Sequence, residues 1–166
     1  MKISKTRLNG VLQIRLKPFN DLRGTYLEIF NKKLFKNTKK KVNFIQDDIS
    51  ISRRNVLRGI HGDFKTWKLV TCLMGKFMLL VVNNKKTDKQ YKKWEKFTLS
   101  EKNNVQILIP PGFGNAHYVE SKKAIFHYKQ STLYDRKSQF TINWQNKEFN
   151  FRWPKKIRPI MSKRDK

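Results

Sequence analysis

The residues most able to do chemistry lie close together in the first half of the chain. Arg58 and His61 occur in the run Arg-Gly-Ile-His-Gly-Asp, and Lys68 follows seven residues after the histidine. An imidazole has an ordinary pKa of about 6.5, near the value that proton transfer at neutral pH requires. A partly desolvated ammonium stabilises a developing oxyanion. This segment therefore predicts the wall of an active site.

Histidines are scarce, which narrows the choice of a general base or metal ligand to His61, His117 and His127. A catalytic metal site commonly needs about three protein ligands, and the residues after His61 are Gly62 and Asp63 where a second histidine would be expected. The sequence therefore favours a general base, and no metal is expected. On residue type alone, a buried structural histidine and an exposed strand lysine remain open alternatives.

Two further residues carry reactive side chains. Tyr128 falls in a predicted strand, where a phenol can donate a proton or serve only in the core or at its rim. Cys72 is the single cysteine and cannot form an intrachain disulfide. Because its neighbours Val70, Leu73 and Met74 are apolar, a buried packing role is expected in preference to a reactive thiol.

The chain is 166 residues long, and a single domain over residues 1–166 is expected. Its 38 Lys and Arg against 12 Asp and Glu give a formal charge of +26, which favours anionic partners. The lysines are scattered through the loops and the hydrophobic content of 38% indicates a filled interior, so nucleic acid is an unlikely partner. With no signal peptide and no apolar span to cross a bilayer, a soluble, cytoplasmic protein is expected.

The elements that must position these residues are predicted to be almost all strands. Polar and apolar residues alternate, β-branched or aromatic runs recur, and sharp turns are predicted at 83–84 and 110–112. Many short strands at close spacing are typical of a β-sandwich, jelly roll or barrel. The best helix candidate, 31–41, has only Leu34 and Phe35 as an apolar stripe. The predicted strands are 12–17, 25–30, 44–52, 67–73, 76–83, 97–99, 105–109, 116–120, 124–129, 140–144 and 149–153.

Seven short segments occur in order along nearly the whole chain. They are 21–28 (D-L-R-G-T-Y-L-E), 44–50 (F-I-Q-D-D-I-S), 55–61 (N-V-L-R-G-I-H), 68–70 (K-L-V), 109–113 (I-P-P-G-F), 153–154 (W-P) and 162–165 (S-K-R-D). In this order they resemble the motifs of the dTDP-4-dehydrorhamnose 3,5-epimerase family, metal-independent enzymes of the cupin fold. Single segments are weak signals, but seven in order are strong. The resemblance implies an all-β, cupin-type jelly roll with a few short surface helices.

In that family a histidine paired with an aspartate removes a proton beside the C4 ketone of a nucleotide sugar. A lysine then steadies the enolate, and a tyrosine returns a proton from the opposite face. The resemblance puts these roles on His61, Asp165, Lys68 and Tyr128. A carboxylate bonded to one ring nitrogen would fix the tautomer and leave the other nitrogen free as the base. The resemblance implies no cofactor and no metal.

The resemblance also implies how substrate and partner bind. An arginine fork suits a pyrophosphate better than a lysine does. The family usually forms dimers in which an N-terminal segment crosses to the partner, so a homodimer is expected. The residues assigned to substrate binding are Arg23, Glu28, Gln46, Arg58, Asn115 and His117.

Two segments depart from the family pattern. The usual G-L-H-(aromatic)-Q is G-I-H-G-D at 59–63, which loses an aromatic and a glutamine beside the base. The usual G-F-A-H-G-F is G-F-G-N-A-H at 112–117, which displaces the histidine by two positions. A reshaped pocket is expected at these places. Both variants are similar to those of a bacterial branch that acts on GDP-linked 4-keto heptoses for capsule synthesis, so that substrate is expected in preference to a dTDP-linked hexose.

Two other functions remain open. A basic β-barrel could bind nucleic acid or another polyanion, with Trp67 and Trp94 as stacking surfaces. A related cupin could instead move the ketone of a nucleotide sugar. The first alternative explains the charge but not the order of the motifs, so an epimerase that inverts C3, C5 or both is favoured.

Overall fold

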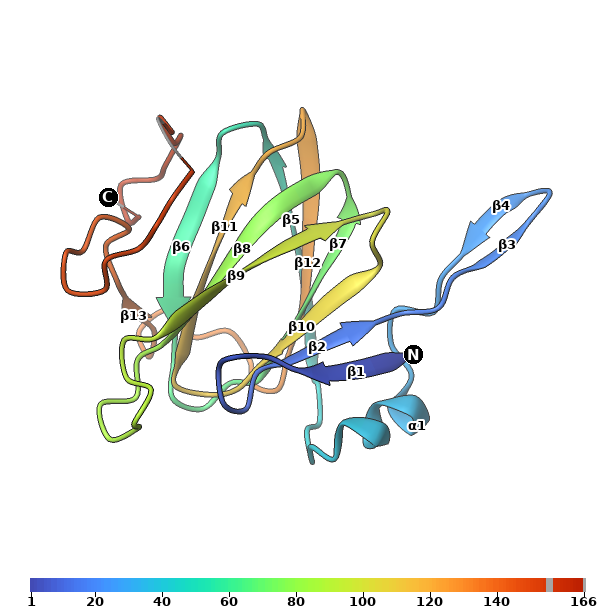
Figure 1. Ribbon diagram of the computed structural model, residues 1–166, viewed down its shortest axis with the longest axis horizontal. Helices are drawn as coiled ribbons and strands as arrows, with labels where there is room; N and C mark the ends of the chain where they lie inside the picture. The colour runs from blue at the N-terminus through green and yellow to red at the C-terminus, as the bar shows by residue number, and fades with distance from the viewer. Residues whose placement is uncertain (155–156, 166) are drawn as a thin grey trace.

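The computed structural model describes residues 1–154 and 157–165, so Lys155, Lys156 and Lys166 of the predicted domain lie outside the described residues. Two antiparallel sheets face each other, and a separate two-stranded hairpin extends from them (Figure 1). The predicted all-β architecture is confirmed. The six-stranded sheet has the order β1 (Lys2–Lys5), β2 (Leu12–Arg15), β10 (Val105–Ile109), β7 (Lys68–Met74), β12 (Lys123–Gln130), β5 (Gln46–Arg53). The five-stranded sheet has the order β13 (Phe140–Thr141), β6 (Leu57–Gly62), β11 (Phe113–Val119), β8 (Lys76–Asn83), β9 (Trp94–Ser100).

Alternation along the strands decides which side chains fill the space between the sheets. Every second residue of β8 from Phe77 belongs to the core between the sheets, and the residues in between, from Met78, belong to the outer layer. The C-terminal segment covers the outer face of the five-stranded sheet with Phe149 and its aromatic neighbours. The N-terminal segment covers the other outer face with Phe35. The sandwich therefore has one shared core and two covered outer faces.

The helix predicted at 31–41 is much shorter in the structure. It consists of α1 (Lys32–Phe35) and one 3-10 turn, η1 (Lys36–Thr38). Lys39 then adopts a left-handed backbone with φ 57°, which ends the turn. Within the described residues, no helix has the length and apolar content that spanning a membrane requires.

Several predicted strands are shortened or absent. Aromatic residues indicate that a segment is buried, but they do not show that its backbone pairs with a neighbouring strand. Residues 149–153 form no strand and instead lie over the five-stranded sheet. Residues 140–144 pair only at β13, and 25–30 only at β4 (Gly24–Tyr26). The turn at 110–112 joins β10 to β11, with Gly112 at φ +81°. The turn at 83–84 opens a longer connection, 84–93, between β8 and β9.

The hairpin formed by β3 (Phe19–Asp21) and β4 projects away from both sheets (Figure 1). Its apolar side chains are exposed, with relative accessibilities of 62% for Phe19, 108% for Leu22 and 70% for Tyr26. Strand β3, like β1, was not predicted from the sequence. An apolar arm without a packing partner in its own chain is a feature to be explained.

Candidate active site

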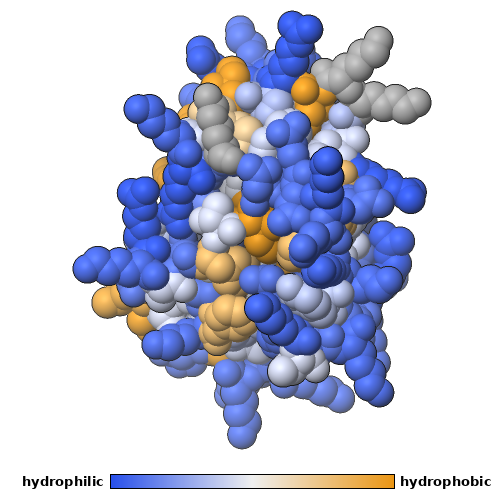
Figure 2. All heavy atoms as spheres, turned by 90° about the vertical axis from the view of Figure 1, so that its left-hand side faces the viewer, coloured by the Kyte–Doolittle hydropathy of each residue, from blue (hydrophilic) through white to orange (hydrophobic). Residues whose placement is uncertain are grey.

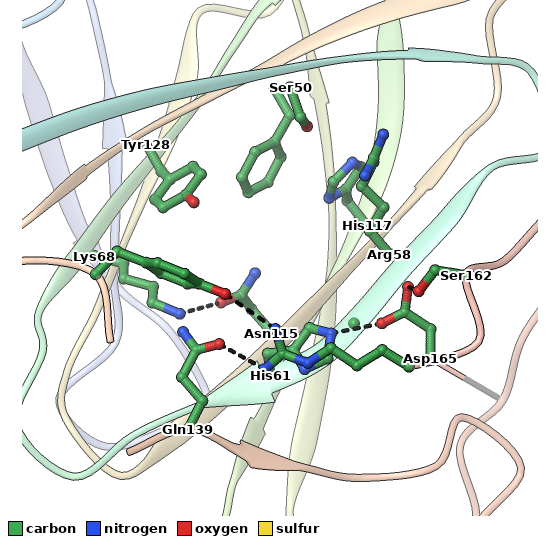
Figure 3. A pocket seen from close by; sticks show the side chains of 14 residues that line it. Ser50, Arg58, His61, Lys68, Asn115, His117, Tyr128, Gln139, Ser162 and Asp165 are labelled. Carbon is green, nitrogen blue, oxygen red and sulfur yellow. Dashed lines mark hydrogen bonds and ion pairs between the residues drawn. The ribbon is translucent and has the colours of Figure 1, made fainter. Parts of the chain in front are cut away.

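A pocket of about 270 Å³ opens between the two sheets, at the end where β6, β7, β11 and β12 come together (Figure 3). Seven of the predicted site residues line it: Arg58, His61, Lys68, Asn115, His117, Tyr128 and Asp165. Arg58, Lys68 and Arg164 supply positive charge, and Asp165 is the single carboxylate among the lining residues. The pocket therefore suits an anionic ligand.

A bulge in β6 brings Arg58 and His61 to the same side of the sheet. Residues three apart on a regular strand face opposite sides, yet both of these line the pocket. The pairing explains this, because Asn115 lies opposite His61 while His117 lies opposite Arg58, so three steps on β6 match two on β11. Gly59 makes the bulge possible, because its φ is +111° and a Cβ there would lie 2.5 Å from the Asn115 carbonyl oxygen.

The centre of the pocket is a hydrogen-bonded pair of a histidine and an aspartate that lie far apart in sequence. His61 Nε2 lies 2.5 Å from Asp165 Oδ1, and Ser162 Oγ donates to Asp165 Oδ2 at 2.8 Å. Burial alone would raise the pKa of Asp165, but the hydrogen bonds from His61 and Ser162 outweigh burial and lower it. Asp165 therefore stays a carboxylate at neutral pH and holds the imidazole in place.

The dyad also fixes which ring nitrogen of His61 can act as a base. A carboxylate only accepts hydrogen bonds, so Nε2 carries the proton and Nδ1 keeps its lone pair. Nδ1 lies 3.1 Å from Thr141 Oγ1 on the neighbouring strand β13, whose hydroxyl then donates to it. A hydroxyl can turn away, so Nδ1 is available for a substrate proton once that contact is released.

Lys68 is held deep in the pocket wall. It is 7% exposed, and its Nζ donates to Asn115 Oδ1 at 3.4 Å. Burial lowers the pKa of Lys68; the nearby Asp63 charge opposes this shift, and the Arg164 charge adds to it. The alternative of an exposed strand lysine, which the sequence left open, is therefore wrong. An ammonium so placed stabilises negative charge that develops on a substrate oxygen.

Tyr128 projects into the pocket from β12, in the six-stranded sheet (Figure 3). Burial, followed by the charge of Asp48, raises the pKa of Tyr128 to about 12. The phenol therefore remains protonated at neutral pH and can serve as a proton donor. His61 lies across the pocket on the five-stranded sheet, so a base and an acid face one space from two walls.

Comparisons with known proteins agree with this geometry. The family model for dTDP-4-dehydrorhamnose 3,5-epimerase matches residues 5–166. The dTDP-4-dehydrorhamnose 3,5-epimerase of Shigella flexneri is 36% identical over 169 residues, covering 99% of this chain and 93% of that protein. The chain belongs to this family. It is thus an isomerase of the epimerase class that acts on nucleotide-linked keto sugars.

Solved structures of dTDP-4-dehydrorhamnose 3,5-epimerases share the whole fold. The Legionella pneumophila enzyme, solved with dTDP-4-keto-L-rhamnose, superposes with a TM-score of 0.94 at 30% identity, covering 99% of this chain and 89% of that one. The Elizabethkingia anophelis enzyme superposes with a TM-score of 0.90 at 32% identity, covering 99% of this chain and 93% of that one. The predicted cupin-type jelly roll is confirmed. The names of these relatives specify dTDP sugars and give no support to the expected GDP-heptose branch.

Residues 62 and 63, where the sequence first departs from the epimerase-family pattern, do not line the pocket. A Cβ on Gly62 would overlap the Phe113 carbonyl oxygen and the ring of Phe140, which fills that space instead. The Asp63 carboxylate turns away to accept the backbone N–H groups of Lys65 at 2.8 Å and Thr66 at 2.6 Å. Gly62 and Asp63 are therefore not among the residues that line the pocket. These residues shape a turn behind it.

Three residues assigned to substrate binding in the epimerase family do not line this pocket. Arg23 lies on the projecting hairpin and pairs with Asp21 at 2.6 Å. Glu28 lines a separate cavity between the N-terminal segment and the six-stranded sheet. Gln46 supports the pocket from behind, because its Oε1 accepts the backbone N–H of Tyr134 at 2.7 Å. Within one chain, the structure does not bring Arg23 and Glu28 to His61.

Several residues that line the pocket were not predicted from the sequence. Arg164 donates to the Tyr134 hydroxyl at 3.1 Å and to Gln139 Oε1 at 2.8 Å. It precedes Asp165 in the terminal motif, so the basic residue of that motif was the available signal. Nothing in the sequence pattern marked Tyr134 or Gln139, which belong to the loop before β13. The remaining missed residues are Ser50, Gly59, Phe126 and Ser162.

The other reactive side chains lie away from this chemistry. His127 faces away from the pocket, with its Nε2 3.0 Å from Asp47 Oδ1. Cys72 is buried as predicted, and burial raises the pKa of its thiol to about 12. Among the residues that the structure describes, no group of three His, Cys, Asp or Glu side chains is arranged to hold a metal ion.

Proposed function

We propose that this chain inverts C3, C5 or both in a dTDP-linked 4-keto-6-deoxy sugar without a cofactor. The observation that carries the proposal is the His61–Asp165 pair facing Tyr128 across a pocket that also holds Lys68. The names of the related Shigella and Legionella proteins support the dTDP nucleotide. The Streptomyces spheroides relative, a 4-keto-6-deoxy sugar epimerase at 26% identity, supports the sugar class.

The proposed reaction moves protons and leaves the redox state unchanged. His61 Nδ1 takes a proton from the carbon beside the ketone, and the C–H electron pair moves to the ketone oxygen as an enolate. Lys68 stabilises this oxyanion. Tyr128 then gives its proton to the same carbon from the opposite face, and the ketone forms again. Proton exchange with solvent restores both groups, and the carbon has inverted.

The same pocket suggests a second candidate substrate, a GDP-linked 4-keto heptose. The departure at 112–117 places Asn115 and His117 in the pocket lining, and this segment is similar to that of the heptose branch. The relatives are named for dTDP sugars, so the dTDP-linked hexose is the first choice. Testing both substrates separates the two.

We also propose a homodimer in which the projecting hairpin enters the partner's pocket. The exposed Phe19, Leu22 and Tyr26 supply an apolar arm that has no packing partner in its own chain. The Arg23 side chain on this arm is 88% exposed and would add a second guanidinium to the substrate's diphosphate. This arrangement explains why Arg23 matches the family's binding motif and yet lies outside its own pocket.

The polyanion-binding alternative loses its structural basis. Trp67 and Trp94 are partly buried, each packed against an apolar cluster. The Trp94 indole donates to the Phe149 carbonyl oxygen at 2.9 Å. Hydrophilic side chains cover most of the face seen in Figure 2.

Proton NMR in heavy water tests the proposed function. Wild type should exchange the hydrogens on the carbons flanking the ketone of dTDP-4-keto-6-deoxyglucose, and His61→Asn should abolish exchange. Tyr128→Phe should still exchange but fail to complete inversion at one centre. His127→Asn is the matched control, since this histidine lies outside the pocket. Absence of exchange with both the dTDP-hexose and the GDP-heptose would sink the proposal.

A further inference from the structure

Two polar atoms in the pocket wall are buried and have no hydrogen-bond partner. Across the described residues, four buried side-chain atoms have neither a hydrogen bond nor an ion pair: Ser50 Oγ, Asn83 Nδ2, His117 Nε2 and His127 Nδ1. Only those of Ser50 and His117 belong to residues that line the pocket. An unsatisfied buried polar group costs free energy, so two beside one cavity point to a ligand that satisfies them.

Both atoms lie at the Arg58 end of the pocket (Figure 3). His117 is the direct cross-strand neighbour of Arg58. The ring of Phe126 stacks on His117 at 4.1 Å between centroids, and Phe126 pairs across the strands with Ser50. Arg58 Nε also donates to the Oγ of Ser52, which faces the same side of β5 as Ser50. The two unpartnered atoms thus flank one guanidinium.

The His117 ring can form hydrogen bonds while it remains neutral. It is 4% exposed, and burial, followed by the charge of Arg58, lowers its pKa to about 3. At neutral pH its ring is therefore neutral, with one nitrogen that donates and one that accepts. A serine hydroxyl also both donates and accepts. A sugar hydroxyl has the same dual character, so it can satisfy both groups whichever tautomer His117 adopts.

The order of groups along the pocket indicates which hydroxyl is bound. Asn115 pairs with His61 at the reacting end, and His117 lies two residues further along β11, about 7 Å away, beside Arg58. A substrate whose ketone side lies at His61 and whose diphosphate lies at Arg58 presents its C2 hydroxyl between them. We propose that His117 and Ser50 bind the C2 hydroxyl and select sugars that carry it; this inference rests on the proposed function.

Binding measurements test this selection without catalysis. The ligands are dTDP-glucose and dTDP-2-deoxyglucose, which lack the ketone, with the GDP-linked pair run in parallel; dissociation constants are measured by calorimetry. Wild type should bind the 2-hydroxy sugar at least about 10-fold more tightly, because the 2-deoxy sugar leaves both atoms unpaired. His117→Phe, which keeps a ring of similar size, should remove most of that ratio by weakening only the 2-hydroxy ligand. Ser50→Ala should reduce it further.

The control is His127→Phe, which changes a second buried histidine that also has an unpartnered nitrogen but lies outside the pocket. It should keep the wild-type ratio. Equal wild-type affinity for the two sugars, equal loss of both in His117→Phe, or failure to bind either nucleotide pair would each overturn the assignment. Selective binding without any solvent exchange would refute the proposed epimerase and leave the C2 assignment standing.

Discussion

At the scale of single residues, the pocket combines groups whose protonation states are set by their surroundings. Asp165 is kept ionised by His61 and Ser162, while burial keeps the Tyr128 phenol protonated. The carboxylate that binds His61 is therefore deprotonated at the pH at which the Tyr128 phenol is protonated. This is the arrangement that a proton relay across a sugar ring requires.

Asp165→Asn should lower kcat by roughly 10²- to 10⁴-fold with little change in KM, because the amide no longer fixes the tautomer and orientation of His61. Ser162→Ala removes only the hydrogen bond to Oδ2 and should cost less than about 10-fold. Steady-state kinetics of both variants measure the difference. Equal effects of the two substitutions would show that the carboxylate has no role beyond packing.

Lys68→Met should make the protein more stable and less active. The folded-state pKa of Lys68 lies below its unfolded value, so the charged ammonium opposes folding at neutral pH; this destabilisation falls as pH rises above the folded pKa and is gone above the unfolded pKa. We expect an unfolding free energy roughly 0.5 to 2 kcal/mol above wild type at pH 7, with a smaller gap near pH 10. Denaturant titrations at the two pH values measure it.

The control for this comparison is Lys123→Met, an exposed lysine at the start of β12. Its effect should stay within about 0.5 kcal/mol at both pH values. If Lys68→Met were no more stable than Lys123→Met at pH 7, burial of the Lys68 ammonium would not destabilise the folded protein.

Much of this residue-level picture could be predicted from the sequence, but only through the order of the motifs. His61, Lys68, Tyr128 and Asp165 do meet in one pocket. Composition alone could not single out Lys68 among the many lysines of the chain. Ser50 was missed because its role depends on which polar atoms are left without partners, and that is a property of packing.

At the scale of elements, β6 decides the geometry of the site. Its bulge puts Arg58 beside His117 and His61 beside Asn115. The long core strands β8 and β10 were predicted with the observed bounds, because β-branched and aromatic runs are reliable in a buried ladder. The bulge could not be predicted, since the period-two pattern assumes a regular strand.

Gly59→Ala should damage activity and stability together. The new Cβ would lie 2.5 Å from the Asn115 carbonyl oxygen and 2.8 Å from the Ala116 Cα, at a φ of +111°. Because neither contact is with a flexible side chain, the strands must shift. We expect the free energy of unfolding to fall by more than about 3 kcal/mol. Unfolding titrations and exchange kinetics measure the two effects.

Gly10→Ala is the matched control. Gly10 has φ +87° in the turn between β1 and β2, but its nearest neighbour, Pro110 Cγ, is an ordinary 3.4 Å away. Gly10→Ala should lower the free energy of unfolding by only about 1 to 2 kcal/mol, the cost of a side chain at a positive φ, and should leave the exchange kinetics normal. Similar losses at the two positions would mean that the bulge tolerates a side chain and does not hold the pocket together.

At the scale of the whole molecule, the projecting hairpin separates Arg23 from the pocket that its motif serves. The sequence could assign Arg23 to the binding set but could not say to which copy of the chain it contributes. The second cavity, which Glu28 lines, lies on the other side of the six-stranded sheet from the pocket. One chain therefore presents its pocket and its arm in different directions, as the proposed dimer requires.

The arm gives a prediction for the assembly. The double variant Phe19→Asp, Leu22→Asp should shift sedimentation from dimer to monomer and raise KM, because charge replaces the apolar surface of the arm. Arg23→Ala should raise KM by about 10-fold or more while the dimer persists. A wild type that sediments as a monomer with full activity would contradict both expectations.

The bulge at Gly59 and Ile60 also bears on how such enzymes can diverge. Arg58 and His61 reach one pocket because two residues separate them and because three steps along β6 match two along β11. Deleting or inserting one residue there would turn either the guanidinium or the imidazole to the outer face. Substrate anchoring and proton abstraction would then be uncoupled without the exchange of any pocket side chain. In this strand, function constrains the number of residues as strictly as their identity.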